Sequence, residues 1–152
     1  MKKTDGVTGA VNKFYLTTAI AYVNAAPHIG HALEFIQADA LCRYHRLKGD
    51  ETFFLTGTDE HGQKISKAAQ EAKLSSIEFV DKVVIQFQDL WNKLQISNDD
   101  FIRTTQERHI KCVQKALQIV YEKGDIYEDK YEGWYCITCE TFWPKTQITD
   151  NL

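Results

Sequence analysis

The stretch Pro27-His28-Ile29-Gly30-His31 stands between an apolar run and a long helical pattern. The apolar run, residues 14–20, predicts a buried strand, and the pattern over 30–47 predicts a helix. A glycine between two histidines at a strand-to-helix turn lets a nucleotide approach the backbone closely. The helix N-terminus favours phosphate, and the imidazoles can donate hydrogen bonds to developing phosphate charge. The stretch therefore predicts a triphosphate site, with two solvated loop histidines as the alternative.

The composition is that of a soluble globular domain. The 152 residues are 43% hydrophobic and 26% charged, and no apolar run reaches the roughly 20 residues that span a bilayer. Residues 1–13 form a polar extension without the apolar core of a signal peptide, so we expect a cytoplasmic protein with no membrane partner. The net charge of −3 argues against a generally basic surface for nucleic acid.

Strand and helix patterns alternate as far as Gly124. The predicted elements are strand 14–20, helix 30–47, strand 52–57, a helix at about 63–72, a helix ending at Leu94, strand 101–104 and a helix ending at Gly124. Strands joined by helices pair in parallel through right-handed crossovers. The predicted fold class is therefore α/β, with 14–125 as the first half of a doubly wound, Rossmann-like nucleotide-binding domain.

Local patterns add detail to the later helices. Capping boxes at Ser75–Glu78 and Thr104–Glu107 mark two helix starts. The last helix carries an apolar stripe that predicts a core contact, made of Ile110, Val113, Leu117, Val120 and Tyr121. Three parallel strands with an uncovered edge make a poor complete domain, so we interpret the chain as the front part of something larger.

Residues 126–152 are rich in tyrosine and tryptophan and predict small strands or hairpins. Within this region Cys136 and Cys139 are separated by two residues, which in a cytosolic chain indicates a metal or redox pair. Such a pair supplies half of a tetrahedral zinc site, which needs four ligands. The other cysteines, Cys42 and Cys112, lie inside helical patterns, and we predict that they are small packed residues.

A second polar motif, Thr56-Gly57-Thr58-Asp59-Glu60-His61-Gly62, comes at the end of the second strand. In open α/β sheets, ligands bind outside the carboxyl ends of the strands. We therefore expect this motif and the histidine stretch to converge on one crevice. Asp59 could hold a substrate ammonium group or help to bind a cation there. The alternative is that Asp59 caps the following helix.

These motifs resemble the class I aminoacyl-tRNA synthetases, in the form specific for methionine. Four blocks carry the resemblance in the family's order, at residues 21–31, 54–64, 100–105 and 131–140. The resemblance extends over about 14–152 and matches only the N-terminal part of the family. It implies that 126–152 begins a connective zinc-knuckle insertion, whose second pair of zinc ligands would lie beyond residue 152.

The resemblance also implies roles for individual residues. Two residues would be catalytic, stabilising the α-phosphate transition state: His28 and His31. The implied ATP-binding residues are His28, Gly30, His31 and Glu34. The implied methionine-binding residues are Ile20, Tyr22 and Asp59, the last through the α-ammonium group. Cys136 and Cys139 would be half of the zinc site.

The implied activity is that of a methionine–tRNA ligase. The methionine carboxylate attacks the α-phosphorus of ATP, giving methionyl-adenylate and pyrophosphate, and the terminal ribose of tRNA then accepts the methionyl group. ATP and Mg²⁺ are the implied cofactors, with Zn²⁺ possible only if ligands beyond residue 152 complete its site. We predict that this chain alone is inactive, since the family's lysine-rich loop and anticodon-binding domain lie past Leu152.

Three other interpretations stay open. The first is a class I synthetase for isoleucine, valine or leucine, although its second block would differ from residues 58–62. The second is a small nucleotidyltransferase, which also uses a His-x-Gly-His motif. The third is a non-catalytic or split-enzyme half that binds RNA or a partner chain carrying the missing half.

Overall fold

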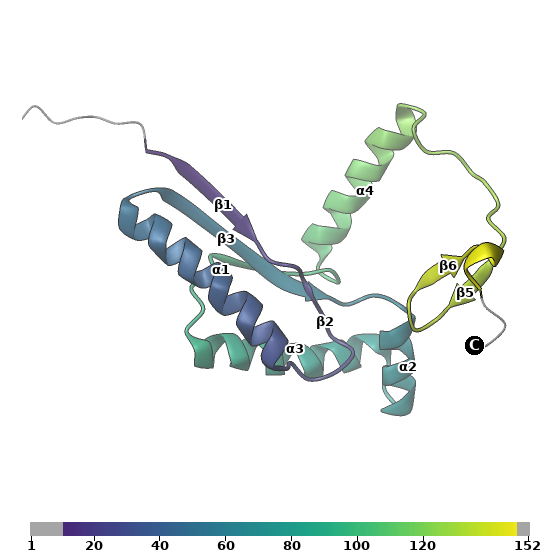
Figure 1. Ribbon diagram of the computed structural model, residues 1–152, viewed down its shortest axis with the longest axis horizontal. Coiled ribbons are helices and arrows are strands. Elements are labelled where there is room, and N and C mark those ends of the chain that lie inside the picture. The colour runs from purple at the N-terminus through teal and green to yellow at the C-terminus, as the bar shows by residue number, and fades with distance from the viewer. Residues whose placement is uncertain (1–10, 149–152) are drawn as a thin grey trace, which may run out of the picture.

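The computed structural model describes residues 11–148, in which a parallel sheet with helices is followed by a small hairpin (Figure 1). The elements are β1 (Lys13–Thr17), β2 (Ala21–Tyr22), α1 (Ile29–Lys48), β3 (Glu51–Asp59), α2 (Gln63–Glu71), α3 (Ser76–Leu94), β4 (Asp100–Arg103), α4 (Glu107–Glu122), β5 (Trp134–Cys136), β6 (Thr141–Trp143) and the helical turn η1 (Lys145–Gln147). The predicted order is confirmed. Residues 1–10 of the predicted extension and 149–152 of the predicted insertion lie outside the described residues.

Strand β3 is the central strand of the sheet, because the other three strands all pair with it in parallel. Its residues 51–55 pair with β1, its residues 58–59 pair with β2, and its residues 55–58 pair with β4. The prediction of parallel pairing is thereby confirmed. Strand β3 is longer than predicted, so Asp59 is the last residue of a strand and not part of a loop.

The predicted buried strand 14–20 is wrong in two respects. The chain leaves the ladder after Thr17 and returns as β2, because the backbone between them is held elsewhere, by Glu34. Strand β1 is also partly exposed: the Tyr15 side chain is 62% exposed, and its register partner Phe53 is 45% exposed. Their rings, 5.9 Å apart, lie on a sheet face that the described helices leave open.

The core lies between α1, α3 and the sheet. Phe35 of α1 packs against Trp91 of α3 with ring centroids 4.3 Å apart, and Phe87 lies 5.6 Å from the same tryptophan. All three are almost fully buried, as is Val23 just after β2. The predicted capping box at the start of α3 is confirmed, since the Ser75 side chain accepts the N–H of residue 78 and the Glu78 carboxylate accepts in return. This core fixes the start of α1 against α3.

Helix α4 departs from its sequence expectations. Its N-cap is Gln106 without a side-chain cap bond, so the predicted capping box 104–107 is wrong. The Thr104 hydroxyl instead accepts the Glu60 N–H, 2.8 Å away. No residue of α4 is buried, so the predicted core stripe finds no cover in the described residues, and Cys112 is exposed where packing was expected. Cys42, by contrast, is buried as predicted.

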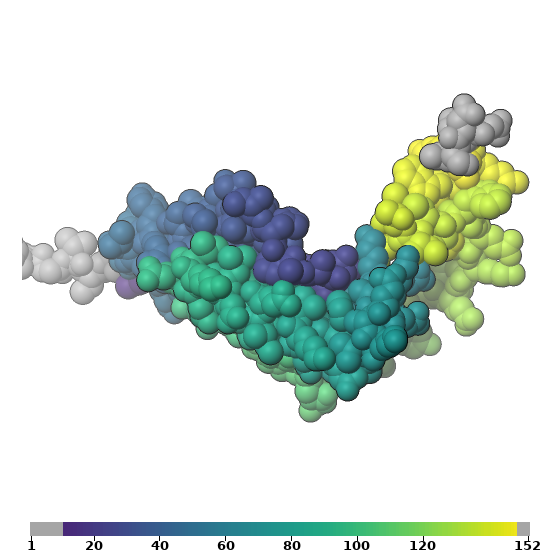
Figure 2. All heavy atoms as spheres, turned by 90° about the horizontal axis from the view of Figure 1, so that it is seen from below, coloured from purple at the N-terminus to yellow at the C-terminus, as the bar shows by residue number. Residues whose placement is uncertain are grey.

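The tail forms the predicted hairpin. Strands β5 and β6 pair antiparallel, with Trp134 opposite Trp143. Figure 2 shows this hairpin as a lobe that stands apart from the body and approaches it beside α2. Among the described helices, none combines the length and apolar character that crossing a membrane requires.

Candidate functional site

The two histidines build the N-terminus of α1. His28 is the extended N-cap residue, and its Nδ1 accepts the Gly30 N–H at 3.1 Å. His31 Nδ1 accepts the His28 N–H at 3.2 Å, and the two rings stack with centroids 4.0 Å apart. Because each Nδ1 accepts a hydrogen bond, each neutral imidazole carries its proton on Nε2. The cap therefore prepares two Nε2–H donors at the positive end of a helix.

A side chain at Gly30 would crowd the His28 ring of the cap. A Cβ built there would lie 2.9 Å from Cε1 of His28, closer than a real Cβ contact allows. His31 also contacts the core, with its ring edge-on to Phe87 at 5.3 Å. Burial lowers the pKa of His31, and the neighbouring His28 lowers it further. Neutral imidazole is thus favoured at the position where a hydrogen-bond donor is expected.

Glu34 holds the loop that carries Ile20. Its Oε1 accepts the Ala19 N–H at 2.9 Å, across the gap between β1 and β2. Ile20, the next residue, is 38% exposed. The observed contact of Glu34 is therefore with the loop of the predicted methionine site, and its predicted role in the ATP pocket stays a prediction.

Asp59 lies at the carboxyl end of β3, beside Tyr22 of β2, with which it pairs in register. Its carbonyl accepts the Val23 N–H at 3.3 Å, and its Oδ1 accepts the His61 N–H at 3.4 Å. Helix α2 begins after Gly62, its N-cap, with no side-chain cap bond. The alternative of Asp59 as a helix cap is therefore wrong, and its carboxylate is bound to no helix end.

The Tyr22 hydroxyl is held by the hairpin. It donates a hydrogen bond to Glu140 Oε1 at 3.0 Å, and Lys64 Nζ lies 3.8 Å from the other carboxylate oxygen. A Cβ on Gly62 would lie 1.9 Å from this hydroxyl, so only glycine leaves room for it. Burial and the Glu140 hydrogen bond raise the pKa of Tyr22 to about 12. Sequence reasoning missed Glu140, whose partner lies 118 residues away along the chain.

The cysteine pair lies where β5 turns into β6, since Cys136 ends β5 and Cys139 is in the connecting turn. Cys136 Sγ accepts the Cys139 N–H at 3.4 Å, and this hydrogen bond lowers the pKa of the Cys136 thiol. The hydrogen bond between the two side chains raises the pKa of the Cys139 thiol. Within residues 11–148 no group of three or more His, Cys, Asp or Glu side chains is arranged to hold a metal ion. The zinc role of the pair, as half of a site, stays a prediction.

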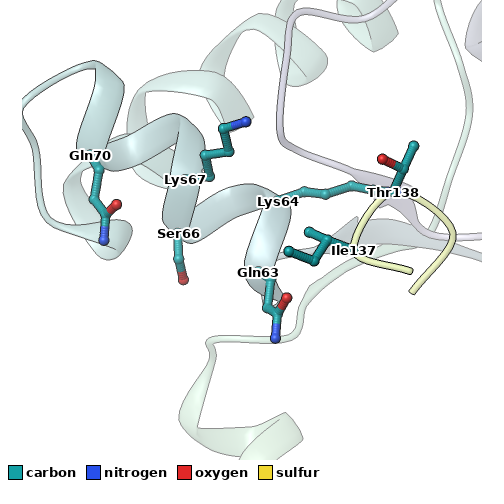
Figure 3. Close-up of a pocket in the computed structure, with 7 residues that line it drawn as sticks. All are labelled: Gln63, Lys64, Ser66, Lys67, Gln70, Ile137 and Thr138. Atoms are coloured by element: carbon teal, nitrogen blue, oxygen red, sulfur yellow. The ribbon is translucent and has the colours of Figure 1, made fainter. Parts of the chain in front are cut away.

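A cavity of about 470 Å³ separates α2 from the hairpin (Figure 3). It is lined by Gln63, Lys64, Ser66, Lys67, Gln70, Ile137 and Thr138. Both of its lysines are already paired, since Lys64 lies 3.8 Å from Glu140 and Lys67 lies 4.0 Å from Glu71. The cavity includes none of the predicted site residues and adjoins the predicted site without being part of it.

Pairing and capping bring the predicted residues together in two groups. The α1 cap joins His28 with His31, and the β2–β3 pair joins Tyr22 with Asp59. Both groups lie where strands β1, β2 and β3 have ended, at one end of the sheet (Figure 1). No hydrogen bond or ion pair among the described residues links one group to the other. Their convergence on one ligand is therefore a prediction.

Comparison with known proteins identifies what this arrangement is similar to. A family model described as "tRNA synthetases class I (M)" matches residues 14–151. The chain is 50% identical over 139 residues to a methionine–tRNA ligase of Clostridium acetobutylicum, covering 91% of the chain and 22% of that relative. It is 52% identical over 136 residues to the one of Thermotoga maritima, again covering 22% of the relative.

Solved structures agree with these relatives. Mycobacterium tuberculosis methionyl-tRNA synthetase in complex with methionyl-adenylate matches with a TM-score of 0.87 and 42% identity, over 92% of this chain and 28% of that one. A leucyl enzyme of Agrobacterium radiobacter K84, in a ternary complex with tRNA, matches with a TM-score of 0.74 at 21% identity, which shows a shared fold alone. The chain thus spans less than a third of the length of the proteins that it matches.

Proposed function

The chain belongs to the methionine group of class I tRNA synthetases, and on this premise we propose that it forms the methionine- and ATP-binding part of a methionine–tRNA ligase. The observation that carries the proposal is the histidine cap. It carries two Nε2–H donors at a helix N-terminus, at the same end of the sheet as the strand end that carries Asp59. Donors of this kind stabilise charge that develops on phosphate oxygens.

In the proposed reaction the methionine carboxylate attacks the α-phosphorus of ATP. The new bond is the mixed anhydride of methionyl-adenylate, and the broken bond releases pyrophosphate. His28 and His31 donate to the α-phosphate oxygens as negative charge grows on them. Asp59 accepts a hydrogen bond from the methionine α-ammonium group, while Tyr22 and Ile20 line the side of the amino acid. These groups position and stabilise, and none forms a covalent intermediate.

The proposal extends to cofactors and partners. Mg²⁺ would accompany ATP by binding phosphate oxygens, as it does in other nucleotide sites. Zn²⁺ would need two ligands in addition to Cys136 and Cys139. Transfer of methionine to tRNA is proposed for the whole protein, of which this chain supplies the first part. A cytoplasmic location is likewise proposed for the whole protein.

A hybrid enzyme tests the proposal. In the Thermotoga maritima relative, the matching N-terminal region is replaced by this chain, and methionine-dependent exchange of pyrophosphate into ATP is measured. We expect exchange with methionine and not with leucine or isoleucine. His28→Ala should lower kcat by about 100-fold or more, the usual cost of a lost transition-state donor. A folded hybrid that exchanges equally well with leucine, or that ignores His28→Ala, would contradict the proposal.

One observation also fits a second possibility, the half of a split enzyme. The apolar stripe of α4 has no buried member in the described residues. A partner chain that supplies the later part of the fold would cover this stripe. Co-purification of the chain with a second polypeptide that restores exchange, without any covalent continuation, would support that possibility.

A further inference from the structure

Glu60, next to Asp59 in the chain, is a buried carboxylate that the proposed reaction does not use. It is only 3% exposed. Thr58 Oγ1 donates to its Oε1 at 2.6 Å, Arg103 Nε donates to the same oxygen at 2.7 Å, and the Thr105 hydroxyl donates to Oε2. A buried charge is tolerated only when it is paired and hydrogen-bonded, and here both oxygens are satisfied. The carboxylate is therefore locked in one position.

Arg103 completes the lock from the neighbouring strand. It pairs in register with Thr58, and its Nη2 lies 3.0 Å from Glu60 Oε2 and 2.5 Å from Asp81 of α3. The hydrogen bond with Glu60 raises the pKa of Arg103. A two-point contact between guanidinium and carboxylate fixes direction as well as distance. The pair thus joins the end of β3 to β4 and to α3.

The backbone around Asp59 is fixed by the same region. The Glu60 N–H donates to Thr104 Oγ1 at 2.8 Å, and a His61 ring nitrogen lies 3.3 Å from the Thr104 carbonyl. Asp59 thus stands between two immobilised neighbours, since Thr58 is fully buried and Glu60 nearly so.

Asp59 and Glu60 point to opposite sides of the sheet. Successive side chains of a strand point to opposite faces, so Thr58 and Asp59, the last two residues of β3, point to opposite faces. Glu60 follows the strand, and its hydrogen bond with Thr58 places its carboxylate on the Thr58 side. If Glu60 were free to turn, the peptide that carries Asp59 could turn with it.

We propose that Glu60 and Arg103 are positioning residues, which hold the Asp59 carboxylate in place for the α-ammonium group of the amino acid. The inference rests on the proposed function for the identity of the ligand. The lock on Asp59 rests only on the contacts described above.

The first test concerns the lock and needs no ligand. Amide hydrogen exchange is measured by NMR on the full chain and on Glu60→Gln, which keeps the shape and removes the charge. We expect exchange at the Val23 and Glu60 amides to accelerate at least tenfold, because these amides depend on the end of β3. Amides of the β1–β3 ladder should change less than twofold. Unchanged protection at Val23 and Glu60, or acceleration throughout the chain, would overturn the inference.

A control comes from the opposite end of β4. Asp100 makes a two-point contact with Arg108, with bonds of 2.6 and 2.9 Å, so Asp100→Asn breaks a pair of the same geometry, more exposed than Glu60–Arg103, away from Asp59. We expect no acceleration at Val23 in this variant. Arg103→Lys keeps the positive charge and loses the two-point contact, so its effect should lie between those of the parent chain and Arg103→Met. Equal effects of Asp100→Asn and Glu60→Gln would count against the lock.

The second test concerns the ligand. Binding of methionine is compared with binding of 4-(methylthio)butanoate, which lacks the ammonium group. We expect Glu60→Gln to raise the Kd for methionine at least tenfold and to leave the Kd of the analogue unchanged, as Asp59→Asn should. Equal losses for both ligands would show a merely structural role and overturn the inference. If the parent chain does not prefer methionine to the analogue, the proposed function fails, while the exchange result still decides the lock.

Discussion

Replacing Gly62 with alanine tests the geometry that joins the hairpin to the site. Gly62 has φ of 120°, and an added Cβ would lie 1.9 Å from the Tyr22 hydroxyl. Ordinary contact begins at 3.4 Å, so the phenol must move away and give up its hydrogen bond to Glu140. We therefore expect Gly62→Ala to destabilise the fold and to release the hairpin from β2.

Two contributions set the size of the effect. An L-residue with φ of 120° and ψ of 166°, a region that essentially only glycine adopts, costs about 1–3 kcal/mol. Loss of a hydrogen bond to a charged group costs about 1–2 kcal/mol once partial exposure is taken into account. The free energy of unfolding should therefore fall by about 2–5 kcal/mol. For a chain of this size, Tm should fall by roughly 4–20 °C.

Thermal unfolding followed by circular dichroism measures this effect, with Gly124→Ala as the control. Gly124 also has a positive φ, 80°, but an added Cβ would meet nothing within 4 Å. It therefore reports the cost of a side chain at positive φ without a steric clash. In a Tyr22→Phe background the hydroxyl is absent, so Gly62→Ala should cost at least 1 kcal/mol less than in the parent chain. A Gly62→Ala cost no larger than that of Gly124→Ala, or one unaffected by Tyr22→Phe, would refute the reasoning.

Three further predictions concern individual groups. The His31 ring should titrate below pH 6.5 by NMR, because burial lowers its pKa, and a midpoint above 6.5 would contradict this. Since the folded state then binds fewer protons than the unfolded state, the stability that neutral His31 contributes is present above pH 6.5 and is lost as the pH falls. Iodoacetamide should label Cys136 before Cys139, because a backbone N–H lowers the pKa of the first thiol; mass spectrometry showing equal rates would count against it. Asp39→Ala should lower the free energy of unfolding by about 2–4 kcal/mol in urea, because Asp39 accepts the Ser97 N–H at 2.8 Å inside the core; a loss below about 1 kcal/mol would exclude that role.

Periodicity predicted the elements well where contacts are local. Helix 30–47 is observed as Ile29–Lys48, and the Ser75 capping box starts α3 as expected. The run 14–20 broke into two strands because Glu34, 15 residues away, captures the backbone N–H of Ala19. An apolar pattern predicts which face of a helix packs against other residues, but it does not identify those residues. The predicted packing face of α4 is therefore correct as a pattern and still has no buried member in the described residues.

In the candidate site, too, residues close in sequence could be predicted and residues far apart in sequence could not. The histidine motif is contiguous in sequence, so His28 and His31 could be selected from their spacing alone. Glu60 and Arg103 are 43 residues apart and meet only because β3 and β4 are paired. The predicted strand stops at Gly57 and the observed one at Asp59, so alternation along the strand did not single out Glu60. The burial of Thr56 and Thr58 on the same side is known only from the structure.

The most direct test of a shared adenylate site is an NMR titration of the isotope-labelled chain with a non-hydrolysable methionyl-adenylate analogue. We predict that the largest shifts fall on the amides of His28, His31 and Asp59, and that the leucyl analogue gives smaller ones. Shifts confined to the cavity between α2 and the hairpin, or shifts that move the histidines and leave Asp59 unchanged, would contradict a common site for ATP and methionine.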